Sequence, residues 1–469
     1  MSELIAYFNS FILLYFIVIN SIYTILFFFS LYGVMRNLRR LKLVEFTDYF
    51  KLRICPPISV IAPAYNEELT IIESVRSLLA LHYPEYELIV VNDGSKDNTL
   101  QKLIDNFELL ESFSAIRLQL PHQPIQRVFR SRQYRNLLVV DKANGGKADA
   151  LNTGINCSRY NHFASIDADS ILDKDSLLRT IRPFMEKPDK MMAVGGIVRI
   201  ANGCTIKNGE VLKVELPSNI YAKFQIVEYF RAFLAGRVGF SVINGLLIIS
   251  GAFGVFRKDI AIAAGGYDSK TVGEDMDLVV KIHKHCRYNS IPYLIEFTPD
   301  PVCWTEAPES AKILSRQRSR WQRGTIEVLI KHIDMLFNPK YGIIGMFSFP
   351  FFFFFEMLGV VVELFGYLYA VFGYIFGILN LNFMIQFLFF AYLYGVLLSI
   401  LSILIEELSF KKYPNFFDVI TICFYALIEN LWYRQMTLVW RVRGVKDYFM
   451  KVHSWGEMTR KGFNGQKGK

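Results

Sequence analysis

Uncharged apolar runs lie near both ends of this 469-residue chain. No residue between Glu3 and Arg36 is charged, and this interval exceeds the ~20 apolar residues that a helix needs to cross a bilayer. Between Lys340 and Lys411 the only charged residues are four glutamates, and an uncharged turn at 377–382 divides the region. The pattern predicts one N-terminal span and two C-terminal spans, at roughly 345–376 and 383–406.

A further apolar segment at 417–433 carries Asp418 and Glu429. This pattern favours a helix lying in the membrane interface over another span. Lys and Arg gather at 36–53, at 411–412 and at 434–451, and basic loops favour the cytoplasmic side. A signal peptide is the competing interpretation of the first run, but no basic residue precedes that run. We therefore expect the N-terminus and the 377–382 turn outside, and the segment between the spans in the cytoplasm.

The region between the spans has mixed composition and is long enough for one α/β domain with a sizeable core. Apolar runs at 58–63, 88–92 and 162–166 each end in polar residues that can open a helix. Repeated strand-then-helix units predict a mostly parallel sheet, in which ligands bind beyond the carboxyl ends of the strands. The three polar ends should therefore meet at one crevice.

The expected organisation has four parts. Residues 1–53 form the first transmembrane helix and a basic linker, and residues 54–335 form the cytoplasmic domain. Residues 336–452 form the C-terminal transmembrane and interfacial helices, and residues 453–469 form a basic tail.

The net charge of +9 lies largely in the membrane-flanking loops and the tail. A membrane surface and an anionic substrate explain it, and no base-stacking pattern accompanies it, so nucleic acid is not an expected partner. The six cysteines form no C-x-x-C pair, which predicts free thiols. His283, His285 and Cys286 have no second ligand pair at useful spacing, so we interpret them as surface residues and not as a zinc site.

Two carboxylates follow the third predicted strand, Asp167 and Asp169. Carboxylates separated by one residue at a strand end can both reach a hard divalent cation, which predicts a Mg²⁺ or Mn²⁺ site that would neutralise a diphosphate. Asp93 ends the second strand and is a candidate acceptor for the base or ribose of a nucleotide. It is equally well explained as a turn Asp before Gly94.

A glycine-rich basic turn spans Lys142 to Lys147 and leads into a helical pattern. Glycines allow the backbone to approach a phosphate or sugar closely, and Lys147 adds a positive charge. An ordinary helix start has the same pattern. No G-x-x-x-x-G-K-[ST] motif accompanies it, which argues against an ATPase.

A carboxylate pair, Glu274 and Asp275, follows a second glycine-rich loop, with Asp277 close by. One of these groups could accept the proton of an attacking hydroxyl, and the sequence alone does not choose between Asp275 and Asp277. Further along, an Arg-rich and Gln-rich segment contains Arg320 beside Trp321. Adjacent residues do not share one helical face, so we expect Arg320 to face a diphosphate and Trp321 to point elsewhere, offering its ring to a sugar.

These motifs, in this order and between these spans, resemble the membrane-embedded glycosyltransferases of family 2, which include hyaluronan, chitin, cellulose and poly-N-acetylglucosamine synthases. The resemblance covers nearly the whole chain and is most specific at Gln317, Arg320 and Trp321, which match a Q-x-x-R-W motif. It implies a nucleotide-diphospho-sugar transferase domain of GT-A type. It also implies that Asp93 and Asp169 bind UDP and its metal, and that Asp275 is the general base.

The resemblance further implies that Gln317, Arg320 and Trp321 border the diphosphate and the acceptor. Ser250 and Gly251 occupy the place of an acceptor contact, and Trp455 and Arg460 resemble a short gating segment. Two departures stand out. The third motif reads Gly-Glu-Asp without the common Thr, and the loop at Ser250 differs from the cellulose-type sequence.

Together these features predict an inverting enzyme that moves a sugar from a UDP-sugar to a growing β-linked glycan at the cell membrane. A non-processive transferase acting on a lipid acceptor is the alternative, and a nucleotide-binding transporter or scaffold is the third hypothesis. Glu356 and Glu363 within a span would be costly facing lipid but tolerable lining a polar path. The sequence leaves open the sugar, the linkage, the acceptor, and whether a second copy or an accessory export subunit takes part.

Overall fold

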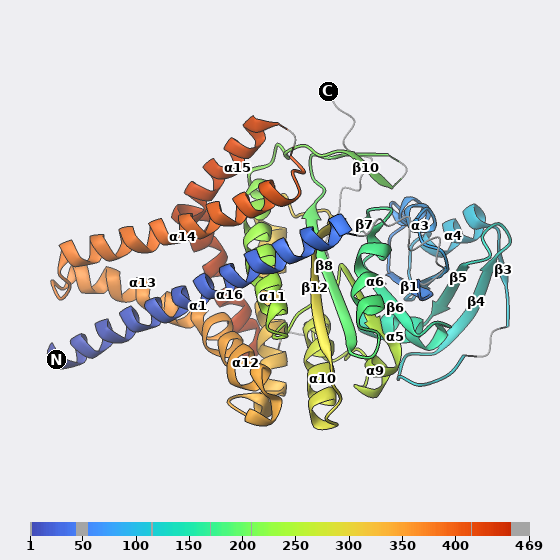
Figure 1. Ribbon diagram of the computed structural model, residues 1–469, viewed down its shortest axis with the longest axis horizontal. Helices are drawn as coiled ribbons and strands as arrows, with labels where there is room; N and C mark the ends of the chain where they lie inside the picture. Colours follow the sequence, from blue (N-terminus) through green and yellow to red (C-terminus); the bar gives the residue numbers. More distant parts are fainter. Residues whose placement is uncertain are drawn as a thin grey trace.

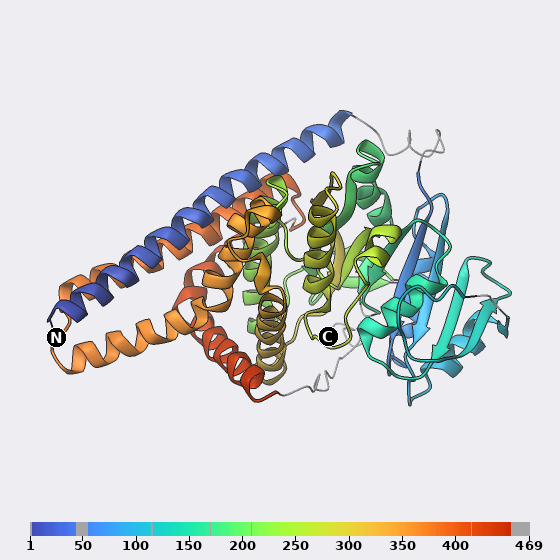
Figure 2. The same ribbon diagram turned by 90° about the horizontal axis from the view of Figure 1, so that it is seen from below.

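The structure is a computed structural model, and it describes residues 2–43, 55–113, 116–168, 170–207, 209–413 and 415–451. A sheet-containing domain lies at one end of the molecule, and long helices extend from it to the other end (Figure 1). The two views agree that α1, α13 and α14 extend away from the sheet toward the end that carries the N-terminus (Figure 2).

The domain is built on a ten-stranded sheet with the order β3-β4-β5-β2-β1-β6-β11-β8-β12-β7. Its strands are β1 (Ile58–Ala64), β2 (Tyr86–Asn92), β3 (Leu109–Glu111), β4 (Ile125–Ser131), β5 (Leu137–Lys142), β6 (His162–Ile166), β7 (Ile171–Leu172), β8 (Met191–Ile200), β11 (Phe253–Arg257) and β12 (Leu294–Thr305). The strands β9 (Thr205–Lys207) and β10 (Glu210–Lys213) form a separate hairpin.

The three strands expected from the sequence form the centre of the sheet. β1 pairs in parallel with β2 and β6, and β2 pairs in parallel with β5. Their residues are buried almost throughout, as expected for parallel strands covered on both faces. The α/β class is confirmed. The sheet as a whole is mixed, because β3, β4, β7 and β11 run antiparallel to neighbouring strands.

The helices of the domain connect and cover these strands. They are α3 (Ile71–Leu79), α4 (Thr99–Phe107), α5 (Lys147–Cys157), α6 (Ser176–Glu186), α7 (Ile220–Tyr229), α8 (Gly239–Val242), α9 (Lys258–Ala263), α10 (Glu274–Tyr288), α11 (Ala311–Lys331) and the short η2 (Ile333–Met335). A π-helical stretch, η1 (Phe230–Val238), joins α7 to α8. Helix α1 packs against η1 and α8, so the long N-terminal helix contacts the domain directly.

Four helical runs are long and apolar enough to cross a membrane: Tyr7–Arg39, Ile344–Ile375, Leu381–Ser409 and Phe416–Phe449. The first lies in α1 (Ser2–Leu43) and the third is α14 (Leu381–Ser409). The second combines η4 (Ile344–Ser348), α12 (Phe349–Phe351), η5 (Phe352–Met357) and α13 (Gly359–Ile375), and follows η3 (Pro339–Tyr341). The fourth combines α15 (Phe416–Ile428), η6 (Glu429–Tyr433) and α16 (Arg434–Phe449), and we call it the last helical run.

The last helical run contains the segment 417–433, for which an interfacial helix was expected, and it continues to Phe449. The side chain of Glu429 is buried and paired with Arg231, so its charge is compensated within the protein. Whether this segment lies in the membrane interface stays a prediction. The expectation for His283 and Cys286 is wrong, because both are buried and not on the surface. The structure describes all six cysteines, and none of them forms a disulfide, as predicted.

Candidate active site

Four of the predicted site residues come together at the end of β6. Lys147, the first residue of α5, forms a short ion pair with Asp167. Asp275, in the first turn of α10, accepts a hydrogen bond from the Gly251 backbone N–H at 3.1 Å. A Cβ atom added at Gly251 would lie 2.7 Å from Lys147 Nζ, so a larger residue here would displace the lysine ammonium. The sheet therefore brings residues 147, 167, 251 and 275 to one point.

Glu274 also belongs to this cluster, although the sequence analysis assigned it no role. Its carboxylate is buried and lies 3.7 Å from Lys147 Nζ. Burial raises the pKa of Glu274 to about 7, against the lowering effect of Lys147. Burial alone would lower the pKa of Lys147, but the negative charges of Asp167 and Glu274 outweigh it and the pKa is raised. Lys147 is therefore held as a cation at the cluster's centre.

The two candidate bases, Asp275 and Asp277, face different surroundings. Asp275 lines the cavity described below. Asp277 is fully buried and accepts from His332 Nε2 at 2.9 Å and Lys331 Nζ at 2.8 Å, with Lys281 Nζ 3.1 Å away. Burial would raise the pKa of Asp277, but these donors together hold it below its usual range. The geometry therefore assigns Asp277 a structural role and leaves Asp275 as the candidate base.

Asp93 lies at the end of β2, as expected, but its carboxylate is turned into the protein. Oδ1 accepts from Lys142 Nζ at 2.6 Å and from the Gly145 N–H at 3.0 Å. Oδ2 accepts from the Gly146 N–H at 2.8 Å and from the Asn144 side chain at 3.1 Å. Asp93 therefore holds the glycine-rich loop that leads to Lys147, and its expected contact with a nucleotide stays a prediction. Local sequence could not reveal partners some 50 residues away.

Helix α11 carries the motif residues Gln317, Arg320 and Trp321. All three residues line one cavity, and the expectation that Arg320 and Trp321 face different parts of it stays a prediction. Arg320 and Trp321 follow Gln317 by three and four residues. These spacings place them on either side of Gln317 along the helix, so the three side chains form one broad stripe on the helix surface. The Arg318 guanidinium lies 4.2 Å from the centroid of the Trp321 ring. Ser250 lines the same cavity.

This cavity, of about 1140 Å³, extends from the cluster at Lys147, Asp167 and Asp275 into the membrane helices. Its far part is lined by residues of α1, α13 and α14, among them Asn9, Glu363, Tyr369 and Phe383. Glu356 and Glu363 both line the cavity, as the hypothesis of a polar path required.

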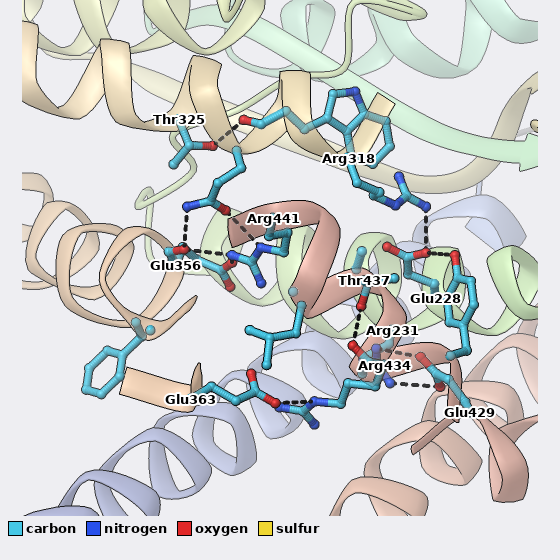
Figure 3. A pocket seen from close by; sticks show the side chains of 18 of the residues that line it. Glu228, Arg231, Arg318, Thr325, Glu356, Glu363, Glu429, Arg434, Thr437 and Arg441 are labelled. Carbon is cyan, nitrogen blue, oxygen red and sulfur yellow. Dashed lines mark hydrogen bonds and ion pairs between the residues drawn. The ribbon is translucent and has the colours of Figure 1, made fainter. Parts of the chain in front are cut away.

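Four ion pairs surround the cavity between its two parts (Figure 3). They are Arg318–Glu228 at 2.6 Å, Arg231–Glu429 at 2.8 Å, Arg441–Glu356 at 3.3 Å and Arg434–Glu363 at 3.5 Å. The last helical run takes part in each: it supplies Arg434, Arg441 and Glu429, and its Tyr433 hydroxyl donates to Glu228 at 2.9 Å. Each carboxylate in this wall is thus neutralised by an arginine from another element.

Asp169, Trp455 and Arg460 lie outside the described residues. Among the described residues no group of three or more His, Cys, Asp or Glu is placed to hold a metal ion. Asp167 lines the cavity and its side chain is partly exposed, so it could serve as one ligand of a divalent cation. The expected second protein ligand is Asp169.

A profile for glycosyl transferase family 2 matches residues 59–226, and one for glycosyl transferase family group 2 matches residues 162–433. The chain belongs to this family. It is a glycosyltransferase with a GT-A-like fold.

Its relatives include poly-β-1,6-N-acetyl-D-glucosamine synthases. The chain is 31% identical to that of Staphylococcus epidermidis over 274 residues, which are 58% of this chain and 56% of the relative. It is 29% identical to that of Staphylococcus aureus strain COL over 284 residues, which are 60% of this chain and 58% of the relative. The match thus spans a little over half the length of these relatives.

Two solved structures are also similar. The first is the mannosyltransferase PcManGT from Pyrobaculum calidifontis in complex with GDP-Man and Mn²⁺, with 16% identity, a TM-score of 0.48, and coverage of 93% of this chain and 99% of that one. The second is S. aureus TarS, with 15% identity, a TM-score of 0.36, and coverage of 59% of this chain and 40% of that one.

Proposed function

We propose that this glycosyltransferase moves a sugar, with inversion, from a UDP-sugar to the end of a growing β-linked glycan at the cytoplasmic face of the membrane. The observation that supports this proposal is the single cavity that joins the cluster at Asp275 to the membrane helices. A glycan lengthened at Asp275 would have a continuous path whose lining combines aromatic and aliphatic side chains with hydroxyls, amides and neutralised charges. Because the relatives are poly-N-acetylglucosamine synthases, UDP-N-acetylglucosamine is the first donor to test.

In the proposed reaction Asp275 accepts the proton of an acceptor hydroxyl. The hydroxyl oxygen attacks the anomeric carbon from the face opposite UDP. A new C–O bond forms, the bond to the diphosphate oxygen breaks, and UDP leaves. Lys147 and Arg320 line this part of the cavity and would stabilise the negative charge that builds up on the leaving diphosphate. Inversion at the anomeric carbon gives the β linkage.

A divalent cation, Mg²⁺ or Mn²⁺, would be held by Asp167 and Asp169 and would offset the charge of the diphosphate. Lys147 pairs with Asp167, so its ammonium lies beside a residue that would hold the cation and could also meet the diphosphate.

A lipid acceptor remains the second candidate. Apolar residues of α14 such as Phe383, Met384 and Leu388 line the far part of the cavity and could accommodate an acyl or prenyl chain. The glycan and lipid proposals differ in their products, since the first gives long chains and the second adds one sugar.

The test uses the full chain in lipid nanodiscs with UDP-N-acetylglucosamine, other UDP-sugars and Mn²⁺, with Asp275→Asn as the inactive control. Mass spectrometry of the products should reveal a distribution of long chains, and NMR should give a β configuration at each new linkage. A single sugar on a lipid would transfer the assignment to the second candidate. Donor binding without any transfer product would refute both proposals and support the scaffold hypothesis.

A further inference from the structure

Arg237 differs from the other arginines of the cavity wall. Arg231, Arg318, Arg434 and Arg441 each form an ion pair with a carboxylate. Arg237 lines the same cavity, but its guanidinium forms no hydrogen bond or ion pair with any residue that the structure describes, and its Nη1 atom is buried. A buried donor without an acceptor is costly, and native structures contain few of them. The missing acceptor is therefore expected on a ligand.

The surroundings of Arg237 hold its guanidinium in a fixed position. The group lies 4.1 Å from the centroid of the Phe233 ring and 5.9 Å from that of Phe297. Stacking covers the flat face of the guanidinium, so its N–H groups can donate only from the edge. Burial lowers the pKa of Arg237 to about 10, so it remains a cation at neutral pH. A desolvated cation of this kind is a strong donor.

The position of η1 indicates which ligand meets Arg237. This π-helical stretch ends at Val238 and packs against α1 and α14, the membrane side of the domain. The diphosphate would lie on the other side, near Lys147 and Asp167 at the end of β6. Arg237 is near enough to Asp275 for the negative charge of that carboxylate to raise its pKa. Arg237 therefore lies beside the candidate base on the side from which the acceptor approaches. Interruption of an α-helix by π geometry is frequent at functional sites.

We infer that Arg237 is an acceptor-binding residue, whose guanidinium donates to an oxygen of the acceptor's terminal sugar and orients its hydroxyl toward Asp275. This inference rests on the proposed function. The oxygen belongs either to an acyl group on the sugar or to a ring hydroxyl, and both offer the same acceptor chemistry to the edge of the guanidinium.

The experiment compares Arg237→Gln and Arg237→Lys with Arg316→Gln, which removes an exposed arginine of α11 that does not line the cavity. Acceptors are β-linked N-acetylglucosamine oligosaccharides and their deacetylated counterparts. Loss of a hydrogen bond from a charged group should raise the acceptor KM of Arg237→Gln by roughly 10- to 100-fold. The donor KM should change by less than about two-fold, since Lys147 and Arg320 meet the diphosphate. Arg237→Lys should recover part of the loss because it keeps the charge.

The two acceptors distinguish the two sources of oxygen. If the rise in acceptor KM of Arg237→Gln disappears with the deacetylated acceptor, Arg237 binds the acyl carbonyl. If the rise is equal with both acceptors, Arg237 binds a ring hydroxyl. An acceptor KM that matches Arg316→Gln, or a donor KM that rises in parallel, would overturn the inference.

A second measurement does not depend on turnover. When the oligosaccharide is titrated into UDP-bound protein, Arg237→Gln should weaken its binding by a factor similar to the rise in acceptor KM. An unchanged affinity for UDP shows that the variant is folded. If the wild type binds the oligosaccharide without transferring sugar to it, the proposed function is refuted. The inference about Arg237 still stands in that case if Arg237→Gln weakens oligosaccharide binding. No oligosaccharide binding to the wild type would overturn the inference itself.

Discussion

Replacing Asp275 and Asp277 one at a time should separate catalysis from stability within one turn of α10. Asp275 faces the cavity and Asp277 is fully buried behind it. Asp275→Asn keeps the size of the side chain but cannot take a proton, so we expect transfer to fall by ~10²–10⁴-fold. The Gly251 and Met276 N–H groups both donate to Asp275, at 3.1 and 2.8 Å, and Asn can accept only one of them well. The fold should lose only about 1 kcal/mol from this change.

Asp277→Asn removes a charge that compensates Lys281 and Lys331 and that is hydrogen-bonded to His332. Breaking a buried ion pair costs ~3–5 kcal/mol, and the 38% exposure of the Lys331 side chain favours the lower end, about 3 kcal/mol. For a domain of this size that corresponds to a fall in the thermal midpoint of roughly 6–12 °C. Activity per folded molecule should stay close to that of the wild type.

The assay measures UDP release and product formation in detergent or nanodiscs, together with the thermal midpoint of the same samples. UDP affinity serves as the control for Asp275→Asn, because donor binding does not require the base. The reasoning fails if Asp277→Asn is inactive with an unchanged midpoint while Asp275→Asn still makes product. That result would mean that the α10 N-terminus presents the other carboxylate to the substrate.

Three further predictions concern acidity, elongation and topology. Burial raises the pKa of Glu274 from 4.5 to about 7, so between these values the folded state keeps a proton that the unfolded chain has released. The contribution of Glu274 to the stability of the folded state should therefore fall as pH rises from about 5 to 7. The difference in thermal midpoint between wild type and Glu274→Gln, measured across this pH range, should change accordingly. A difference that does not change with pH would count against a buried, protonated Glu274. Trp321→Ala should shorten the product more than it slows hydrolysis of the donor by water, because the half-exposed ring offers a surface to the terminal sugar; equal losses would exclude that role. An impermeant thiol reagent added outside cells should label a cysteine placed at Asn380 and spare one at Lys412, and the reverse pattern would overturn the proposed orientation.

The convergence of the strand ends could be predicted from the sequence because parallel sheets impose it. Once 58–63, 88–92 and 162–166 are assigned to parallel strands, their carboxyl ends must share one edge. This inference needs only local pattern and the general geometry of the fold.

The roles that sequence reasoning missed depend on distant partners. Asp93 could serve a nucleotide or a loop equally well until Lys142 and Asn144 were found against its carboxylate. Glu274 resembles Asp275 in the sequence, and only its burial distinguishes it. Arg237 is one arginine among many in the sequence. Only the structure shows that it has no hydrogen bond or ion pair with a described residue, in contrast to four other arginines of the cavity.

The four ion pairs also impose an order on how the chain is made. Arg231 precedes its partner Glu429 by 198 positions, which corresponds to roughly 10–40 s of synthesis at typical rates. Glu228 has Arg318 as a partner before that run is made, whereas Glu356 and Glu363 likewise emerge before their partners Arg441 and Arg434. Until the last helical run arrives, these groups must keep water or the insertion machinery as their partner, because burial of an uncompensated charge is costly. The catalytic domain can therefore fold while the cavity is still open on one side. The wall of the cavity is completed only after the last helical run has been made.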